Sequence, residues 1–287
     1  MTMERPWEHW HVRVVLLAVA LATLACATSQ NFLDPEGPRY VGSFGRAAVE
    51  AALRPPAPIR VVTFNVRMAS DVDGAIALLA RTEALRQPDI LLLQEMDAAG
   101  VERLAGALGF NYVYFPSSVH PRSRREFGTA VLSPWPLDDE RKLVLPHASL
   151  TTRVRRAVTS AVVHRGGLRI RAYAVHLPPP VAISGRERRD QVQVITADAA
   201  AHDDLVVVGG DFNDRDVGPW FEAAGFRWLT DGLPGTSRQV GFWFSLDHVF
   251  ARGLRLSGTV PAAGVVDAGS ASDHRAVWVL LEPDPVS

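Results

Sequence analysis

The sequence contains almost no cysteine and almost no lysine. Cys26 is the only cysteine among 287 residues, so an internal disulfide is excluded. There is no HExxH or CxxC pattern, and therefore no zinc motif. Of the 30 lysines and arginines only Lys142 is a lysine, and the formal net charge is −1. A chain with this balance has no global positive field to draw it to nucleic acid.

Long apolar runs are also scarce, with one exception near the N-terminus. Residues 14–24 form an uncharged run of 11 residues, whereas a membrane-spanning helix needs about 20. Arginines precede the run and small residues follow it around Cys26. This pattern is typical of a secretory signal. We therefore expect an exported protein.

Two interpretations of the signal stay open. Ala25-Cys26-Ala27 fits the small-x-small rule of a secreted protein, whereas a lone cysteine at the end of the run favours a lipoprotein signal. We predict a signal peptide over residues 1–26, of the lipoprotein type, with membrane attachment through lipidated Cys26. The location is then the cell envelope, or the medium if the protein is secreted. No protein partner is implied.

Residues 27–58 are rich in proline and show little periodicity, which predicts a linker with one short helix over residues 46–53. Residues 59–283 carry the periodic patterns of a single domain. Helices are predicted at 73–87, 98–108, 185–201 and 217–224, and a polar loop at 117–126. Strands are predicted at 59–66, 89–94, 110–115, 128–133, 154–165, 168–176, 205–209, 246–251 and 276–281. Helices flanking two strand-rich halves favour the α/β class: a four-layer α/β/β/α sandwich of two mixed sheets.

Polar groups stand at the ends of several apolar strands. They are Thr63-Phe64-Asn65, Gln94-Glu95, His176-Leu177, Gly210-Asp211-Phe212-Asn213 and Ser272-Asp273-His274, and Asp247 lies within a sixth strand. Open α/β sheets place their sites at such strand ends. The oxygen donors suit Mg²⁺, or alternatively Mn²⁺ or Ca²⁺. An acid inside an apolar strand needs a partner, and His274 is the expected partner of Asp247.

Each group also has an ordinary structural explanation. Glu95 could cap a helix, Asn65 and Asp211 could be turn residues, and His176 could be a hydrogen-bonded core histidine. These explanations are independent of one another, and all would have to hold together. A shared catalytic site is the better account.

These segments, in this order, resemble the endonuclease/exonuclease/phosphatase superfamily with the deoxyribonuclease-I-like fold. The resemblance covers about residues 59–283 and implies a metal-dependent phosphoesterase. It implies that Asn65 and Glu95 hold the metal, with Asp273 close to it, and that Asp211 orients or activates the attacking water. It further implies that Asn213 contacts phosphate, that His176 contacts phosphate or assists the leaving group, and that His274, oriented by Asp247, stabilises the pentacovalent phosphorus.

The chain departs from the family pattern at two places near the site. Gly128-Thr129-Ala130 replaces Gly-Asn-Ala, and Ala174-Val175-His176-Leu177 replaces Asn-Thr-His-Leu. Three arginine groups, at 122–125, 153–156 and 186–189, fit either a polyanion groove or a solvated surface, and the second is favoured. The aromatic run 242–244 fits base stacking, lipid contact or strand packing, and packing is favoured.

We expect a phosphate-ester substrate. The leading hypothesis is a phosphodiesterase acting outside the cytoplasm on nucleic acid or a phospholipid head group. A phosphomonoesterase acting on a phosphorylated polyol or lipid is the first alternative. A tethered binding protein without activity is an alternative of another class, which the complete set of site residues disfavours.

Overall fold

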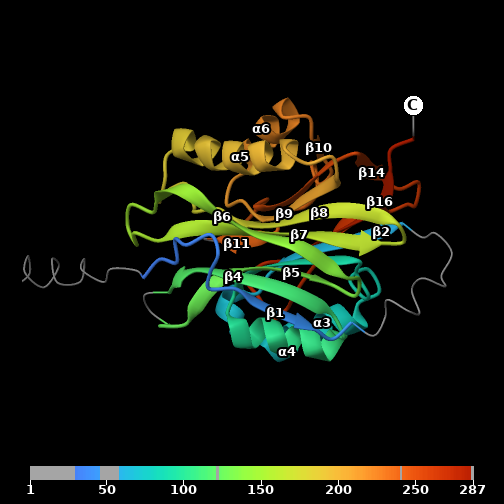
Figure 1. Ribbon diagram of the computed structural model, residues 1–287, viewed down its shortest axis with the longest axis horizontal. Helices are drawn as coiled ribbons and strands as arrows, with labels where there is room; N and C mark the ends of the chain where they lie inside the picture. The colour runs from blue at the N-terminus through green and yellow to red at the C-terminus, as the bar shows by residue number, and fades with distance from the viewer. Residues whose placement is uncertain (1–29, 46–57, 121–122, 240, 286–287) are drawn as a thin grey trace, which may run out of the picture.

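The computed structural model describes residues 30–45, 58–120, 123–239 and 241–285. The predicted signal peptide (1–26) and the predicted helix 46–53 lie outside these ranges. Within them, no helix is both long and apolar enough to cross a lipid bilayer. Two sheets pack face to face with a pair of helices on each outer face, as Figure 1 shows. The predicted four-layer sandwich of mixed sheets is confirmed.

The first sheet has the order β1-β4-β5-β3-β2-β16-β14, and β15 also pairs with β16. The second has the order β10-β13-β9-β8-β7-β6. The first comprises β1 (Tyr40–Ser43), β2 (Ile59–Asn65), β3 (Ile90–Met96), β4 (Asn111–Val119), β5 (Glu126–Ser133), β14 (Leu254–Leu256), β15 (Ala263–Val266) and β16 (Ala276–Pro283). The second comprises β6 (Leu137–Ala148), β7 (Arg155–Arg165), β8 (Leu168–His176), β9 (Leu205–Asp211), β10 (Arg227–Trp228) and β13 (Asp247–Arg252). Two further strands, β11 (Ser237–Gln239) and β12 (Phe242–Phe244), form a separate ribbon.

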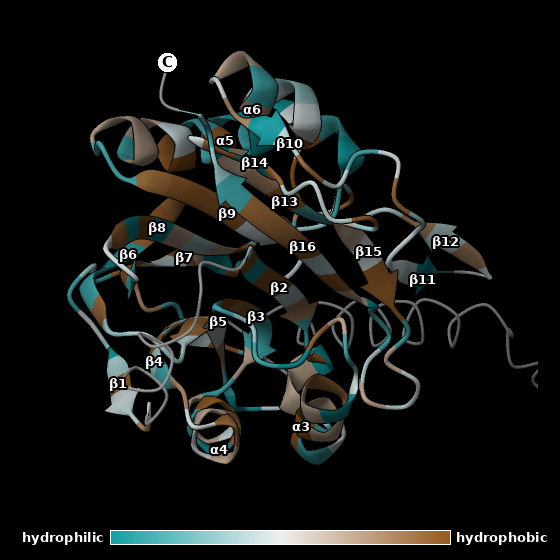
Figure 2. Cartoon of the chain, turned by 90° about the vertical axis from the view of Figure 1, so that its right-hand side faces the viewer, coloured by the Kyte–Doolittle hydropathy of each residue, from teal (hydrophilic) through white to brown (hydrophobic). Residues whose placement is uncertain are grey.

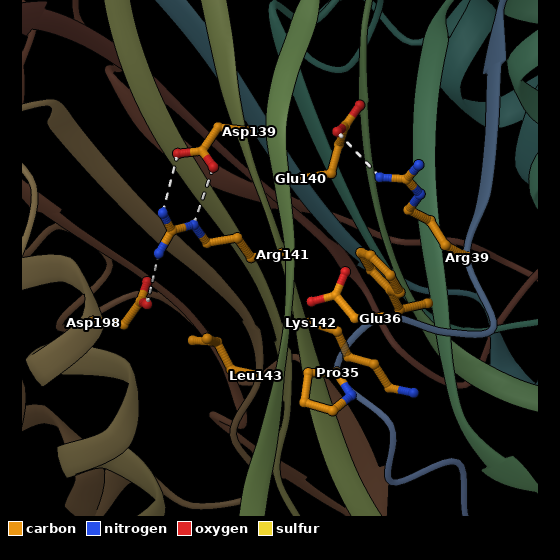
Figure 3. Close-up of a pocket in the computed structure, with 10 residues that line it drawn as sticks. Pro35, Glu36, Arg39, Asp139, Glu140, Arg141, Lys142, Leu143 and Asp198 are labelled. Atoms are coloured by element: carbon orange, nitrogen blue, oxygen red, sulfur yellow. Dashed lines mark hydrogen bonds and ion pairs between the residues drawn. The ribbon is translucent and has the colours of Figure 1, made fainter.

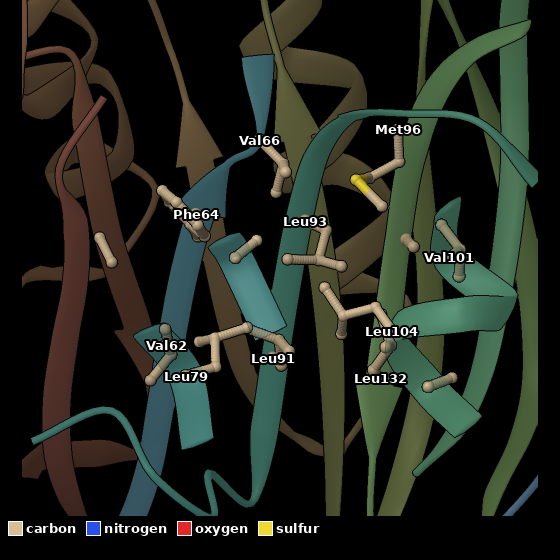
Figure 4. Packing of buried hydrophobic residues seen from close by; sticks show 14 of the residues in the cluster. Val62, Phe64, Val66, Leu79, Leu91, Leu93, Met96, Val101, Leu104 and Leu132 are labelled. Atoms are coloured by element: carbon tan, nitrogen blue, oxygen red, sulfur yellow. The ribbon is translucent and has the colours of Figure 1, made fainter. Parts of the chain in front are cut away.

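Four helices cover the outer faces of the sheets. Helices α3 (Val72–Arg81) and α4 (Ala98–Leu108) lie on the first sheet, and α5 (Gly185–Ala200) and α6 (Gly218–Ala223) on the second (Figure 1). Strands β3 and β9 are buried on both faces, which explains their continuous apolar runs. In β3, Leu91 and Leu93 pack toward the helices and Leu92 packs into the space between the sheets. Figure 4 shows Leu91 and Leu93 beside Leu79 and Leu104 of the two helices.

Two of the predicted segments differ in extent from the structure and strand β6 was missed, each for a local reason. The helix predicted over residues 73–87 ends at Arg81, because Thr82 is extended and Arg60 binds the carbonyl oxygens of Glu83 and Arg86 at 2.7 Å. The loop predicted at 117–126 is much shorter. Strand β4 continues to Val119 and β5 begins at Glu126. A bulge between Pro116 and Ser118 of β4 shifts the register of their pairing. Strand β6 was not predicted, because its first half is charged and it lies at the edge of its sheet.

A strand also lies within the segment predicted as a linker. Strand β1 pairs antiparallel with β4, and Lys142 donates hydrogen bonds to the carbonyl oxygens of Asp34 and Gly37 at 3.1 and 2.9 Å. Residues 34–43 therefore lie against the domain. Strands β7 and β8 form a hairpin, with Gly166 and Gly167 both at positive φ in a two-residue turn.

Candidate active site

The predicted site residues converge because of how the strands run. Strands β2 and β3 are parallel, as are β8 and β9, so their carboxyl ends meet at one end of the sandwich. Strands β13 and β16 run antiparallel to these neighbours, and their first residues therefore reach the same end. Figure 2 shows the strands side by side, with β2 next to β16 and β9 next to β13.

Asn65 and Asp211 link the two sheets at the centre of the site. Asn65 ends β2, is fully buried, and donates from Nδ2 to Asp211 Oδ2 at 3.0 Å and to Glu95 Oε1 at 3.3 Å. Its Oδ1 accepts the backbone N–H of Arg67 at 3.0 Å. Burial raises the pKa of Asp211 to about 7, with Asp247 and Glu95 adding to this while His274 opposes it. Asp211 is therefore poised to exchange a proton near neutral pH.

The close packing behind Asp211 depends on a glycine. Gly210 pairs with Val175 across β9 and β8 and has a positive φ of 157°. A Cβ at this position would overlap the Val175 carbonyl. The Gly-Asp pair is thus needed to bring the Asp211 carboxylate against His176.

Glu95 is held in a strained backbone conformation. It lies at a β-bulge between Gln94 and Met96 and has a φ of 58°, which is uncommon for a residue other than glycine. Its Oε2 accepts the Met68 N–H at 2.9 Å, and its side chain is 21% exposed. Such strain persists only where the surroundings impose it, and it is common at active sites. The bulge turns the Glu95 carboxylate toward Asn65 rather than into the sheet.

His274 lies between two carboxylates. Its Nδ1 is 2.8 Å from Asp247 Oδ2, and its Nε2 is 3.8 Å from Asp211 Oδ2. Burial lowers its pKa, but Asp247 and Asp211 outweigh this and raise it to about 10. His274 is thus an imidazolium at neutral pH, as the predicted pairing with Asp247 requires. The other oxygen of Asp247, Oδ1, is buried and has no hydrogen-bond partner among the described residues.

His176, unlike His274, is neutral. Burial lowers its pKa well below the ordinary value, and Arg156 and His274 lower it further. Arg156 Nη1 lies 3.4 Å from His176 Nδ1, and since arginine only donates, Nδ1 is the acceptor. The ring proton is then on Nε2, which faces Asp211 Oδ2 at 3.5 Å and Glu95 Oε1 at 3.9 Å. His176 is a neutral hydrogen-bond donor directed into the site.

Arg156 belongs to the site, although the sequence placed it in an arginine group interpreted mainly as surface. Its guanidinium lies 4.6 Å from the centre of the Phe127 ring. Burial lowers its pKa to about 10, against the opposing charges of Glu95 and Asp211, so it stays protonated at neutral pH. The sequence offered one signal for this, the position of Arg156 in the alternation of side chains between the two faces of β7. Two residues along on the same face of β7, Val158 packs in the core beneath α5, whereas Arg156 lies near the start of the strand, beside His176.

Asn213 and Asp273 lie farther from this centre. Asn213 has a φ of 55°, donates its N–H to Asp211 Oδ1 at 2.9 Å, and donates from Nδ2 to the Leu177 carbonyl at 2.9 Å. The Asp273 carboxylate is 54% exposed and lies 3.8 Å from Arg67 Nε. No hydrogen bond or ion pair joins Asp273 to Asn65 or Glu95 among the described residues. Its predicted place beside the metal stays a prediction.

Two hydroxyl groups hold site residues through the backbone: Ser272, which belongs to a segment that the sequence singled out, and Thr236, which the sequence did not single out. Ser272 Oγ donates to the Asn65 carbonyl at 2.6 Å and accepts the His274 N–H at 3.1 Å. Thr236 Oγ1 accepts the Asp247 N–H at 3.1 Å. Thr236 holds Asp247 through a backbone atom, so it leaves no pattern in the sequence beyond an ordinary loop hydroxyl.

The residues fit a hard divalent cation. Asp211, Asp247 and His274 offer ligand atoms within 4.8 Å of one another, and the Glu95 carboxylate adjoins Asn65. The three buried or half-buried carboxylates carry more negative charge than His274 and Arg156 neutralise, which favours a bound cation. The imidazolium form of His274 is a poor ligand because a metal needs the neutral ring. The partly exposed Glu95 side of the cluster is therefore the better cation position.

A cavity of about 420 Å³ lies elsewhere, between residues 35–39 and β6. Figure 3 shows its charged lining, in which Arg141 pairs with Asp139 and Asp198, and Arg39 pairs with Glu140. Of the described residues that line it, none is a predicted site residue. The opposite charges in the wall already neutralise one another, so the cavity does not compete with the site described above.

The comparisons with known proteins agree with this geometry. The family model described as "Endonuclease/Exonuclease/phosphatase family" matches residues 62–274. No curated protein matches the chain. Residues 62–274 contain every predicted site residue, from Asn65 to His274.

Several solved structures share the fold at low sequence identity. An endonuclease/exonuclease/phosphatase family protein from Leptotrichia buccalis is 20% identical with a TM-score of 0.62, covering 78% of this chain and 99% of its own. An endonuclease/exonuclease/phosphatase from Beutenbergia cavernae is 22% identical with a TM-score of 0.60, over 79% and 72% of the two chains. D. rerio TDP2, complexed with single strand DNA product, is 16% identical with a TM-score of 0.59, over 79% and 100%.

Proposed function

Since the chain belongs to the endonuclease/exonuclease/phosphatase family and is a metal-dependent phosphoesterase, we propose that it is a phosphodiesterase acting outside the cytoplasm. One observation carries the proposal. A carboxylate with a raised pKa, Asp211, faces an imidazolium, His274, beside a neutral imidazole and a guanidinium. This set can accept a proton from water while stabilising negative charge on phosphorus.

The roles follow from the charge states. Asp211 accepts the proton of the attacking water, since its raised pKa makes it a competent base near neutral pH. His274, held by Asp247, keeps its proton and donates from Nε2 to a phosphoryl oxygen as charge develops. Arg156 supplies a fixed positive charge, and His176 Nε2–H is a second donor.

Glu95 and Asn65 would hold the divalent cation, which we propose is Mg²⁺. Asn65 Nδ2 donates to Glu95 Oε1 and orients that carboxylate, while Asn65 Oδ1 accepts the Arg67 N–H and keeps a second lone pair with which it could bind the ion. The bound ion would polarise a phosphoryl oxygen and neutralise charge on the leaving group. Carboxylate and amide oxygens are the ligands that Mg²⁺ prefers.

A substrate panel tests the proposal. Release would be measured with Mg²⁺, Mn²⁺ or Ca²⁺ from bis-(p-nitrophenyl) phosphate, plasmid DNA, single-stranded DNA, phospholipid and inositol phosphates. Asp211→Ala and His274→Ala serve as inactive controls. Hydrolysis of diesters, lost in both variants, supports the proposal, and hydrolysis of monoesters alone would replace it with the phosphomonoesterase alternative. No release from any substrate would contradict an enzymatic role.

We further propose that the protein is exported and anchored through lipidated Cys26. The support is the apolar run at 14–24 followed by the lone cysteine. Replacing Cys26 with Ser should move the protein from the membrane fraction to the soluble exported fraction. An unchanged membrane pool would contradict the lipid anchor.

A further inference from the structure

The ribbon formed by β11 and β12 exposes three consecutive aromatic side chains. Phe242 is 71% exposed, Trp243 42% and Phe244 45%. The ribbon is separate from both main sheets and projects beyond β15 at the side of the molecule, as Figure 2 shows. The sequence favoured packing for this run, but exposed aromatic groups of this size on a soluble surface mark an interaction site.

The two faces of the ribbon differ in chemistry. Successive residues of a strand point to opposite faces, so Phe242 and Phe244 share one face and Trp243 lies on the other. Arg238 is the cross-strand partner of Trp243, and the Arg275 guanidinium lies 3.6 Å from the centre of the Trp243 ring. One face therefore carries the two phenylalanines beside their cross-strand partners Ser237 and Gln239, and the other combines an indole with two guanidinium groups. This is the composition of a segment that lies at an apolar–polar boundary.

The ribbon is joined directly to the active site. Ser237 forms a backbone bridge with His274, and the Arg275 N–H donates to the Thr236 carbonyl at 2.7 Å. Thr236 also accepts the N–H of Asp247. A ligand of the ribbon is thus held at the rim of the active site, beside the ion pair of Asp247 and His274.

We propose that the aromatic ribbon binds a phospholipid surface and presents the site to lipid head groups. This inference rests on the proposed function, because it names the phosphodiester class that the site would meet. Phe242 and Phe244 enter the acyl region, Trp243 lies at the interface, and Arg238 contacts head-group phosphates. Lipidated Cys26, if present as proposed, would hold the protein at such a surface.

A second apolar pair on the other flank of the site supports a lipid surface. Leu150 and Val181 are both exposed, and the Leu150 N–H donates to the Ala182 carbonyl at 2.8 Å, so their loops adjoin. One loop precedes β7 and Arg156, and the other follows β8 and His176. Aliphatic side chains do not stack on bases, but they do enter an apolar medium.

The charge around the site also favours lipid over a nucleic acid strand. Three arginines near the rim pair with carboxylates: Arg67 with Asp273, Arg125 with Asp97, and Arg275 with Asp267. The net charge of the chain is −1. A groove that follows a polyanion needs a continuous surplus of positive charge, which these three ion pairs reduce.

The test compares the full chain carrying Cys26→Ser with the same chain carrying Phe242→Ser and Phe244→Ser. The N-terminus is then common to both proteins. Val260→Ser, an exposed apolar residue between β14 and β15, is the matched control. Binding is measured by co-sedimentation with phosphatidylcholine vesicles, with and without phosphatidylglycerol, and with a single-stranded DNA oligonucleotide. Hydrolysis is measured on vesicle phospholipid and on soluble bis-(p-nitrophenyl) phosphate.

We expect the double variant to bind vesicles about ten- to hundredfold more weakly than its parent, and the Val260 variant to bind like the parent. Vesicle hydrolysis should fall in parallel while soluble diester hydrolysis is unchanged. Equal vesicle binding by parent and double variant would overturn the inference. So would DNA binding that depends on the phenylalanines without vesicle binding. Loss of the soluble activity in the parent itself would instead contradict the proposed function.

Discussion

The carboxylates of Asp247 and Asp211 lie at opposite nitrogens of one imidazole, that of His274. Asp247 is 2.8 Å from Nδ1, and Asp211 is 3.8 Å from Nε2. The two acids are direct cross-strand partners on β13 and β9. One contact is a hydrogen bond that fixes the ring, whereas the other is too long for a hydrogen bond, so the Nε2 proton is not committed to Asp211.

Replacing Asp247 with Asn should keep the shape of the pair but remove the charge that most raises the pKa of His274. We expect kcat to fall about 10²- to 10⁴-fold, the range seen when a charge-stabilising or acid–base group is lost. Kinetics on a soluble diester and an NMR titration of His274 check this. Asp267→Asn, an exposed carboxylate near the site, is the control. A His274 pKa that stays near 10 in the variant would contradict the pairing.

The dependence of kcat/KM on pH should be bell-shaped. Activity rises as Asp211 loses its proton, whose pKa burial raises to about 7, and falls as His274 loses its proton near pH 10. A cation beside Asp211 favours the ionised form, so the acidic limb lies at or below 7 when metal is bound. Asp247→Asn should move the alkaline limb to lower pH. A profile that is flat from pH 6 to pH 10 would speak against both roles.

Glu95→Gln should weaken metal binding while the fold stays intact. The amide is a poorer ligand for a hard cation, and we expect the half-saturating Mg²⁺ concentration to rise about tenfold or more. Metal titration of activity and calorimetric Mg²⁺ binding measure the change. Glu102→Gln, on the exposed face of α4, is the matched control. An unchanged metal affinity would place the cation elsewhere, with Asp211, Asp247 and His274 as the next candidates.

Arg156→Gln should raise KM for an anionic diester about tenfold, because the fixed positive charge beside His176 is lost. The pKa of His176 should rise at the same time, since Arg156 is one cause of its depression. Steady-state kinetics and an NMR titration of His176 test the two effects. Arg153→Gln, an exposed arginine of the same sequence group, should change neither. If both variants behave alike, Arg156 is only part of the surface.

Lys142→Met should loosen the segment that precedes β2. The ammonium is buried, its pKa is lowered to about 8 by that burial, and it binds the carbonyl oxygens of Asp34 and Gly37. Loss of these charged hydrogen bonds should destabilise the protein by about 1 to 3 kcal/mol. Chemical denaturation and limited proteolysis near residue 37 measure the effect. Arg141→Met, the partly exposed neighbour, is the control. Unaltered protease resistance would show that β1 alone holds the segment.

The sequence predicted most of the sandwich because its central strands are buried on both faces. Strand β8 was predicted with its observed bounds, and β3 and β9 within two residues; β3 and β9 are apolar runs that end in a polar group, and β8 follows a Gly-Gly turn. Strands β1 and β6 escaped prediction because edge strands tolerate charge, proline and glycine. Their pairing is decided by neighbours far along the chain.

The sequence by itself determined which polar residues end the strands, and therefore the candidate members of the site. Only the tertiary structure decided the charge state of each of these residues and which residues surround it. His176 is neutral because Arg156 and burial surround it, whereas His274 is charged because Asp247 and Asp211 flank it. Likewise, the aromatic run 242–244 is exposed because its ribbon leaves both sheets. A pKa and an exposure depend on what packs around a group, and that packing comes from segments distant in the sequence.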